Sequence, residues 1–129
     1  MHTKIKGKIG ELYVSAKLLE MGYQVFGNLT EESSIDLVAY KDDEYLRIQI
    51  KSVTPEDELL VVPLKSSTYK YRKYYTKNDV DIIAVFDSKN YEVYFIPPDI
   101  NKTSIKLRLS LPKSGQIQKI HLAENFKNI

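Results

Sequence analysis

The sequence contains no cysteine and only two histidines. The chain therefore has no disulfide, no thiolate metal site and no cysteine nucleophile, and a reducing compartment suits it. His2 and His121 are too few and too far apart in the sequence for a zinc site. No apolar run approaches the roughly 20 residues that a membrane span needs, and the basic N-terminal residues lack the apolar stretch of a signal peptide. We expect a cytoplasmic protein with no membrane partner.

Motifs of several enzyme classes are also missing. The sequence has no phosphate-binding Walker loop, no dinucleotide fingerprint and no nucleophile-elbow serine. Ser33, Ser34 and Ser52 have no histidine near them in the sequence, so serine hydrolysis has little support.

Length and composition predict one domain with one core. The chain has 129 residues, of which 43% are hydrophobic and 28% charged. Charge is unevenly distributed: residues 31–58 carry nine acidic and three basic residues, whereas 59–78 and 100–123 each carry five basic residues and no acidic one. An acidic centre between basic segments suits an enzyme that binds a cation while holding a polyanion. Solvated charge that clusters by chance is the alternative.

Hydrophobic spacing predicts one helix followed by several strands. Ile5, Ile9, Leu12, Ala16 and Leu19 recur at helical spacing before Gly22, which predicts a helix over residues 3–20. Strands are predicted at 23–26, 35–40, 45–53, 59–64, 81–87, 91–96 and 105–111, with a central place for 81–87 because it is apolar on both faces. Further helical pieces are expected near residue 70 and over 116–125, where Ile117, Ile120 and Ala123 would be buried. This order predicts an α+β or α/β domain around a mixed β-sheet.

The hairpin of residues 35–53 groups polar residues in an unusual way. Arg47, Gln49 and Lys51 share one face of their strand. If residues 42–43 form a two-residue turn, Asp36 faces Gln49, with Cβ atoms roughly 4.5–5.5 Å apart. Mg²⁺ prefers carboxylate and carbonyl oxygens together with water and phosphate, so Asp36, the Gln49 amide oxygen and the Ile50 carbonyl could hold it. A solvent-facing cross-strand pair of Asp36 and Lys51 is the structural alternative.

Glu11 offers a second carboxylate on the first helix. Gly7 and Gly10 precede it, and each costs roughly 1 kcal/mol in a helix relative to alanine. A helix that keeps both glycines is expected to approach a strand or a phosphate backbone closely. An exposed helical carboxylate is the alternative for Glu11 alone.

Taken in order, these segments resemble the PD-(D/E)xK nuclease superfamily. The matching segments are Gly7-x-x-Gly10-Glu11, Ser34-Ile35-Asp36-Leu37-Val38 and Gln49-Ile50-Lys51. Archaeal Holliday-junction resolvases share the first helix and hairpin. Group I intron-associated homing endonucleases of this fold look more similar overall, through Tyr69-Lys70-Tyr71, Val80–Phe86, Ile96-Pro97 and Leu107-Arg108-Leu109. Gln49 stands where the superfamily usually has an acidic residue.

The resemblance implies a restriction-endonuclease-like core, a mixed sheet flanked by helices, and a metal-dependent DNA endonuclease of the homing type. It assigns catalytic roles to Glu11, Asp36, Gln49 and Lys51, and metal binding to Glu11, Asp36, the Ile50 carbonyl and, as a further ligand, Gln49. The expected cofactor is Mg²⁺, with Mn²⁺ as a substitute and Ca²⁺ binding without supporting cleavage. A Holliday-junction resolvase and a non-catalytic DNA-binding module of the same fold are the alternatives.

Double-stranded or branched DNA is the expected partner. Residues 66–78 interleave tyrosines with basic residues, which neutralise phosphates while tyrosines contact phosphate or sugar. A basic surface segment with partly buried tyrosines is the alternative. The predicted DNA contacts are Lys4, Lys6, Lys8, Lys70, Tyr71, Arg72, Lys73, Lys77, Lys106 and Arg108.

The same resemblance leads to predictions of the domain organisation and the assembly. We expect a single nuclease domain over 1–129, with a core at about 3–98 and a C-terminal DNA-binding or oligomerisation extension at about 99–129. Cutting two strands with one site per chain implies a homodimer or homotetramer. Leu59–Leu64 or the C-terminal segment is the expected interface.

Overall fold

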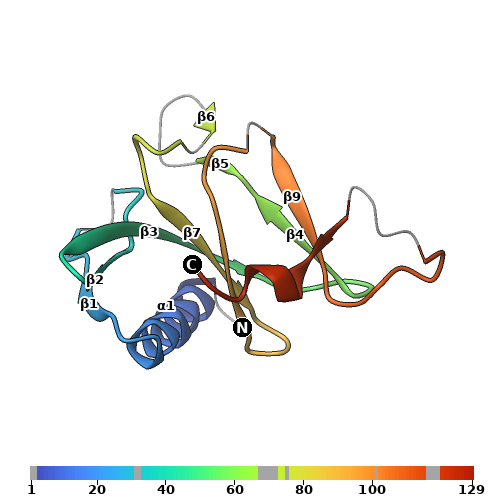
Figure 1. The fold of residues 1–129 in the computed structure, drawn as a ribbon, viewed down its shortest axis with the longest axis horizontal. Helices are drawn as coiled ribbons and strands as arrows, with labels where there is room; N and C mark the ends of the chain where they lie inside the picture. Colours follow the sequence, from blue (N-terminus) through green and yellow to red (C-terminus); the bar gives the residue numbers. More distant parts are fainter. Residues whose placement is uncertain (1–2, 31–32, 67–72, 75, 101, 116–119) are drawn as a thin grey trace.

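The structure is a computed structural model that describes residues 3–30, 33–66, 73–74, 76–100, 102–115 and 120–129. Within these ranges the chain forms α-helix α1, a series of β-strands and a 3-10 helix η1 (Figure 1). Their bounds are α1 Thr3–Glu20, β1 Gln24–Gly27, β2 Leu37–Lys41, β3 Glu44–Val53, β4 Leu59–Pro63, β5 Lys65–Ser66, β6 Lys73–Tyr74, β7 Ile82–Asp87, β8 Val93–Ile96, β9 Ser104–Arg108, β10 His121–Leu122 and η1 Ala123–Phe126.

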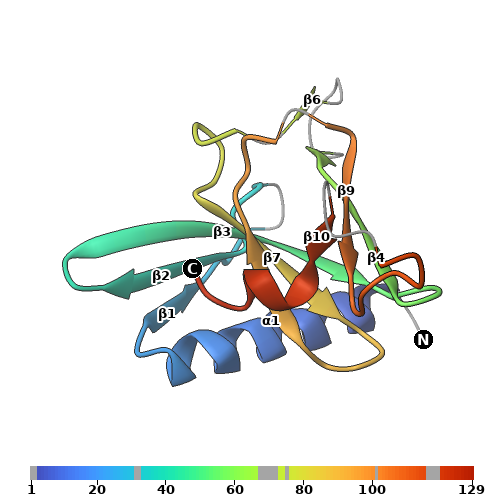
Figure 2. The same ribbon diagram turned by 45° about the vertical axis from the view of Figure 1, so that its right-hand side comes forward.

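A five-stranded mixed sheet forms the centre of the molecule, in the order β1-β2-β3-β7-β8. The β3 and β7 strands run parallel, whereas the other neighbouring pairs are antiparallel. Helix α1 lies across one face of this sheet (Figure 2). The helix contacts β1, β3, β7 and β8, so its position depends on packing against these strands.

The helix ends as the sequence predicts. Gly22 has a φ of +92°, which favours glycine because it has no Cβ. Its N–H donates to the Leu19 carbonyl at 3.0 Å, and the Tyr23 N–H donates to the Leu18 carbonyl at 3.0 Å. The Leu18 and Leu19 carbonyls are therefore satisfied as the chain turns into β1.

The apolar stripe that predicted α1 is not the face that the helix buries. The buried residues are Gly10, Val14 and Leu18, which pack with Leu37, Ala39, Ile48, Ala84, Phe86, Val93 and Phe95. Ile5, Leu12 and Leu19 are exposed on the other side. Both sets recur at helical spacing, so periodicity alone does not distinguish them.

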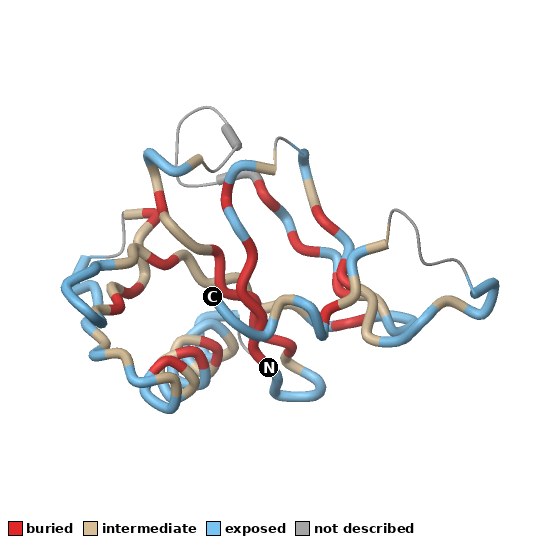
Figure 3. The backbone as a smooth tube through the Cα atoms, viewed as in Figure 1, coloured by how far each residue is buried: buried red, intermediate tan, exposed pale blue. Residues whose placement is uncertain are grey.

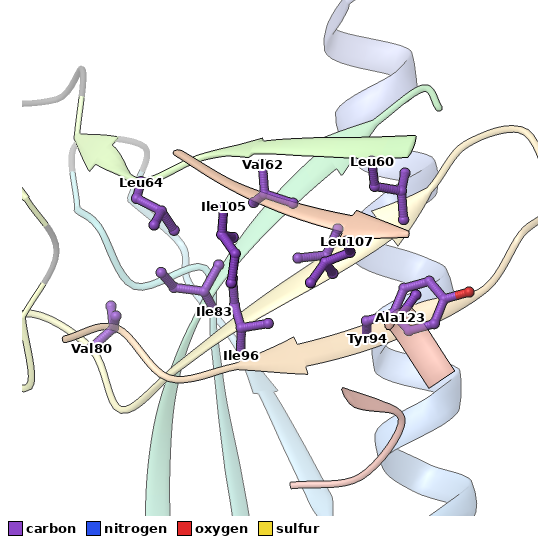
Figure 4. Close-up of a cluster of buried hydrophobic side chains, with 11 residues drawn as sticks. Leu60, Val62, Leu64, Val80, Ile83, Tyr94, Ile96, Ile105, Leu107 and Ala123 are labelled. Atoms are coloured by element: carbon purple, nitrogen blue, oxygen red, sulfur yellow. The ribbon is translucent and has the colours of Figure 1, made fainter. Parts of the chain in front are cut away.

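The other face of the central sheet is covered by a second sheet, in the order β10-β9-β4. Alternate residues of β7 and β8 point to this side, where they pack with apolar residues of β4 and β9 (Figure 4). This core consists of Leu60, Val62, Leu64, Val80, Ile83, Val85, Tyr94, Ile96, Ile105, Leu107 and Ala123. Figure 3 shows that the buried stretches run through the two sheets, while the tip of the β2–β3 hairpin is exposed. The central place predicted for residues 81–87 is thus confirmed.

The predicted closing helix over 116–125 is wrong where the structure describes it. His121–Leu122 pairs in parallel with Leu107–Arg108 as β10, and only Ala123–Phe126 is helical, as a 3-10 turn. The open edge of β9 supplies backbone partners, which the spacing of apolar residues does not reveal. Ala123 is buried as predicted and Ile120 is half-buried, whereas Ile117 lies outside the described residues.

The predicted helical piece near residue 70 falls mostly outside the described residues. At its described end, Lys73–Tyr74 pairs with Lys65–Ser66 as a short antiparallel ribbon. The described part of the chain contains no helix long and apolar enough to cross a membrane.

Candidate active site

The β2–β3 hairpin has the register that the sequence predicts. Its turn residues Asp42 and Asp43 have φ values of +52° and +62°, as a two-residue type I′ turn requires. Leu37 pairs with Ile48 and Lys41 with Glu44, so continuing this register by one position before Leu37 brings Asp36 opposite Gln49. The turn conformation fixes this pairing, because a slip of one residue would move every side chain to the other face.

Asp36 lies immediately before β2. Its backbone and its carboxylate both form hydrogen bonds with β3. Its own N–H donates to the Ile48 carbonyl at 2.8 Å. Its Oδ2 accepts the Ile50 N–H at 2.8 Å and the Gln49 Nε2 at 2.9 Å. The side chain thereby satisfies a backbone donor at the point where β2 has ended. These bonds hold the carboxylate in a fixed orientation over β3.

The Gln49 amide lies between two oxygen atoms. Its Nε2 donates to Asp36 Oδ2 and lies 3.2 Å from the Ile50 carbonyl oxygen. Both neighbours are acceptors, so the nitrogen rather than the oxygen of the amide faces them. Three of the predicted site groups, the Asp36 carboxylate, the Gln49 amide and the Ile50 carbonyl, are therefore brought together.

Glu11 and Lys51 lie within electrostatic range of Asp36. Burial raises the pKa of Asp36 above its ordinary value, the Ile50 hydrogen bond opposes this, the nearby Glu11 charge raises the pKa further and Lys51 lowers it. Glu11 also forms an ion pair with Lys8, with Nζ to Oε2 at 3.3 Å. The helix carboxylate and the strand lysine therefore both act on the charge of Asp36.

Gly10 explains how α1 can approach β3 so closely. A Cβ at this position would clash with the Ser52 hydroxyl and lie 3.2 Å from Phe86 Cδ2. Ser52 follows Lys51 on β3, so the close approach occurs next to the site. No neighbouring atom lies within 4 Å of the corresponding position at Gly7. The prediction of a close helix–strand approach is confirmed for Gly10 and not for Gly7.

The family of the protein follows from a comparison with family models. A model described as PD-(D/E)XK endonuclease matches residues 1–129. The chain belongs to the PD-(D/E)XK endonuclease family. A search of solved structures finds a bacterial homing endonuclease, I-Ssp6803I, with a TM-score of 0.76 and 24% sequence identity, covering 98% of this chain and 89% of that one. No curated protein matches the sequence.

These findings confirm two predictions made from the sequence. The superfamily resemblance is confirmed by the family match over the whole chain. The restriction-endonuclease-like fold is confirmed by the similarity to the homing endonuclease structure. The protein is therefore an endonuclease by family.

PD-(D/E)XK nucleases generally use divalent metal ions, and the donor groups of this site fit a hard cation. The described residues contain no group of three or more His, Asp or Glu side chains that could hold a metal. Oxygen ligands are nevertheless available from Asp36, Glu11 and the Ile50 carbonyl, and Mg²⁺ is commonly bound through one or two carboxylates with water and phosphate. The charges of Glu11 and Asp36 together equal that of one divalent cation.

The basic residues predicted to contact DNA fall into separate groups. Lys6 donates from Nζ to Thr54 Oγ1 at 2.7 Å, near the end of β3, and Lys8 pairs with Glu11. Lys106 is exposed and Arg108 half-buried on β9, in the other sheet. Lys70, Tyr71 and Arg72 lie outside the described residues. Lys73 begins β6, and Lys77 lies in the loop between β6 and β7. Among the described residues, Lys106 and Arg108 thus belong to the second sheet, whereas Asp36 adjoins the central sheet.

A cavity of about 480 Å³ on the second sheet extends the basic face of β9. Its lining includes Lys106 and Arg108 and adds Lys102 and His121. His121 reaches this place because β10 pairs with β9. Sequence reasoning set His121 aside as an isolated histidine, and no local signal places it beside Lys106.

Arg47 is a second residue whose role the sequence did not reveal. Its guanidinium donates to Asp81 Oδ2 at 3.1 Å and to the carbonyls of Lys77 and Asn78. The hydrogen bond to Arg47 lowers the pKa of Asp81. Arg47 therefore fastens the loop before β7 to the strand that carries Gln49 and Lys51. Alternation showed that Arg47 shares their face, but its partner lies 34 residues away in the sequence.

Proposed function

We propose that this protein is a metal-dependent endonuclease that hydrolyses phosphodiester bonds in DNA, with the active site at Asp36. One observation carries the proposal: Asp36 is fixed by Gln49 and the Ile50 N–H beside the lysine of the (D/E)xK segment. Family membership supports nuclease chemistry at this place.

Each residue has a distinct role in the proposed reaction. Asp36 and Glu11 supply carboxylates for a divalent cation, and the Ile50 carbonyl adds a neutral ligand. When bound, the cation polarises a phosphoryl oxygen and lowers the pKa of a water molecule. Lys51 stabilises the negative charge that develops on the phosphate during attack.

Gln49 holds Asp36 in place and can become a ligand itself. Its oxygen would face a cation only after the amide turns, because the nitrogen faces Asp36 and the Ile50 carbonyl. A glutamine in this place leaves the site with one negative charge fewer than a carboxylate would give. We propose that one cation binds more tightly than any second.

The proposed cofactor is Mg²⁺. Mn²⁺ has the same preference for octahedral oxygen coordination and is expected to replace it. Ca²⁺ accepts longer and less regular coordination, so we expect it to bind without supporting cleavage.

The proposed type is a sequence-specific homing endonuclease that acts as a homodimer or homotetramer. The fold is similar to that of a bacterial homing endonuclease, which supports this choice over a junction resolvase. Two cuts in a duplex require two active sites, and each chain offers one.

Cleavage of two labelled substrates tests the proposal: a four-way junction and a library of long randomised duplexes, each with Mg²⁺, Mn²⁺ or Ca²⁺. Asp36→Ala removes the proposed ligand. Asp57→Asn is the matched control, because Asp57 is an exposed carboxylate in the turn before β4.

We expect a cut consensus to be recovered from the duplex library with Mg²⁺ and Mn²⁺, retained in Asp57→Asn and lost in Asp36→Ala. Nicking of the junction without a duplex consensus would identify a resolvase. DNA binding that survives Asp36→Ala, with no cutting by the unsubstituted protein, would identify a non-catalytic module.

A further inference from the structure

The outer surface of α1 carries an apolar stripe that the described part of the chain leaves largely exposed. Ile5, Leu12 and Leu19 have exposed fractions of 56%, 63% and 59%. Ala16 is also exposed, whereas Ile9 is half-buried because it packs against the core of its own chain. Figure 2 shows this helix at the edge of the molecule, with the sheet on one side only. Large apolar side chains gathered on one exposed face indicate an interaction site.

The spacing of the stripe is that of a two-helix seam. Residues 5, 9, 12, 16 and 19 alternate steps of four and three, which is the a/d pattern of a helical heptad. The stripe runs for about 21 Å along the helix, at 1.5 Å per residue. It lies opposite the buried face formed by Gly10, Val14 and Leu18. One helix thus has two apolar faces, of which its own sheet uses one.

Aromatic side chains widen this surface beyond the helix. Tyr13 stacks on Phe86 with ring centroids 5.0 Å apart and contacts Tyr91 at 5.3 Å. Tyr13 and Tyr91 remain 43% and 56% exposed. Tyrosine is enriched at protein–protein interfaces, where it offers a large contact area at a low cost in side-chain entropy.

We propose that the outer face of α1 is the surface through which two copies of this chain associate, with their α1 helices antiparallel about a two-fold axis near Leu12 and Tyr13. We call this surface the α1 face, and it consists of Ile5, Ile9, Leu12, Tyr13, Ala16, Leu19 and Tyr91. An isologous dimer needs only one self-complementary patch, and the two ends of this stripe, Ile5 and Leu19, are equally far from Leu12 along the helix.

Charge on the flank of the stripe favours the antiparallel direction. Lys6, Tyr13 and Glu20 occupy equivalent heptad positions on one side. Lys6 Nζ donates to Thr54 Oγ1 within its own chain. In an antiparallel pair Lys6 of one copy would exchange this partner for Glu20 of the second copy, and the two Tyr13 rings would lie side by side. A parallel pair would instead gather Lys4, Lys6 and Lys8 of both copies at one end, where like charges repel.

The size of the α1 face sets the expected strength. A standard interface buries about 800 Å² on each partner, and a single helix face with two tyrosines lies at the lower end of that range. Interfaces of standard size range from micromolar to picomolar in dissociation constant, and we expect this one at the weak end, at about 1 µM or above. The predicted interface at Leu59–Leu64 offers less apolar surface, because Leu60, Val62 and Leu64 are buried in the core of the same chain.

Sedimentation equilibrium over a range of protein concentrations tests the proposal. Leu12→Glu places a charge at the centre of the α1 face without disturbing the core, because Leu12 is exposed. Val61→Glu is the matched control: Val61 is 45% exposed on the outer face of β4. Circular dichroism melting of both variants verifies that they stay folded. The measurement uses neither DNA nor metal, so it is separate from the proposed cleavage chemistry. A monomeric protein would also contradict the homodimer or homotetramer of the proposed function, whereas dimerisation that survives Leu12→Glu would contradict the α1 face alone.

We expect a reversible dimer for the unsubstituted protein and for Val61→Glu, and at least a tenfold weaker dimer for Leu12→Glu. Lys6→Glu and Glu20→Lys are each expected to weaken the dimer, and the two substitutions together are expected to restore it. A protein that is monomeric throughout the range would overturn the proposal. So would dimerisation that survives Leu12→Glu, or a Lys6→Glu/Glu20→Lys pair that is no better than its single variants.

Discussion

The Asp36 carboxylate is the most constrained polar group of the candidate site. It is partly buried, lies near Glu11 and accepts two hydrogen bonds from β3. Burial disfavours its ionised form, although cation binding requires that form. In the absence of metal the ionised Asp36 carboxylate is therefore unfavourable. The folded protein is less stable than it would be with a neutral residue at this position.

Asp36→Asn is expected to increase the free energy of unfolding of the metal-free protein at pH 7, by on the order of 1 kcal/mol. A raised folded pKa means that protonated Asp36 favours the folded state, and this contribution is lost as the pH rises through the folded pKa. The gain from asparagine should therefore appear at neutral pH and vanish below the ordinary aspartate pKa of about 3.9. Urea unfolding at both pH values measures it. The Asp57→Asn variant should show no such gain, and a loss of stability in Asp36→Asn at pH 7 would contradict the argument.

The same raised pKa predicts the pH dependence of metal binding. A cation competes with a proton for Asp36, so affinity should fall as the pH falls through the raised pKa, at a higher pH than for an ordinary aspartate. Calorimetric titration with Ca²⁺ across the acid range measures this midpoint without cleavage. A midpoint at or below the ordinary aspartate value would count against Asp36 as a ligand.

Helix α1 and strand β3 act as a unit, because Glu11 is on one and Lys51 on the other. Their separation depends on Gly10, which leaves room for Ser52 and Phe86. Arg47 adds a second constraint on the same strand by holding the loop before β7. The strand thus fixes the helix beside the site and the loop that leads into the central strand.

Gly10→Ala is expected to destabilise the protein by about 1–3 kcal/mol, because the added Cβ pushes α1 away from β3. The cleavage rate should fall by more than the loss of folded protein explains, because Glu11 moves with the helix. Gly7→Ala is the matched control, and it should be neutral or stabilising by up to about 1 kcal/mol because alanine favours the helix and meets no atom there. Chemical denaturation and cleavage rates of both variants measure these effects. Equal behaviour of the two alanine variants would show that the close approach at Gly10 is unimportant.

Across the whole molecule, the acidic site and the basic face of β9 belong to different sheets. The central sheet carries Asp36, whereas Lys106 and Arg108 lie on the second sheet beside His121. A long DNA duplex could contact both, which suits a small protein that recognises an extended target. Electrostatic contacts to phosphate release counterions, so each contact contributes to the salt dependence of binding.

Lys106→Gln is expected to weaken DNA binding and to reduce the slope of log affinity against log salt concentration by about 1. Fold stability should not change, because Lys106 is exposed. Lys89→Gln, at an exposed position in the β7–β8 turn, is the control and should leave the slope unaltered. Fluorescence anisotropy over a salt series, with Ca²⁺ in place of Mg²⁺, gives both slopes. An unchanged slope for Lys106→Gln would remove β9 from the DNA interface.

The sequence by itself determined the features that depend on neighbouring residues. The register of the β2–β3 hairpin followed from a two-residue Asp42-Asp43 turn and the alternation of side chains, so Asp36, Gln49 and Ile50 could be grouped correctly. The end of α1 at Gly22 and the central strand β7 followed from equally local signals.

Tertiary structure decided which surfaces meet. Two sets of apolar residues on α1 have helical spacing, and only packing against the sheet selected Val14 and Leu18 for the core rather than Leu12 and Leu19. The β10 strand replaced a predicted helix because β9 offered it an edge. Arg47 and His121 acquired partners distant in the sequence for the same reason. Periodicity records the spacing of side chains along one element, whereas burial depends on the element that packs against it.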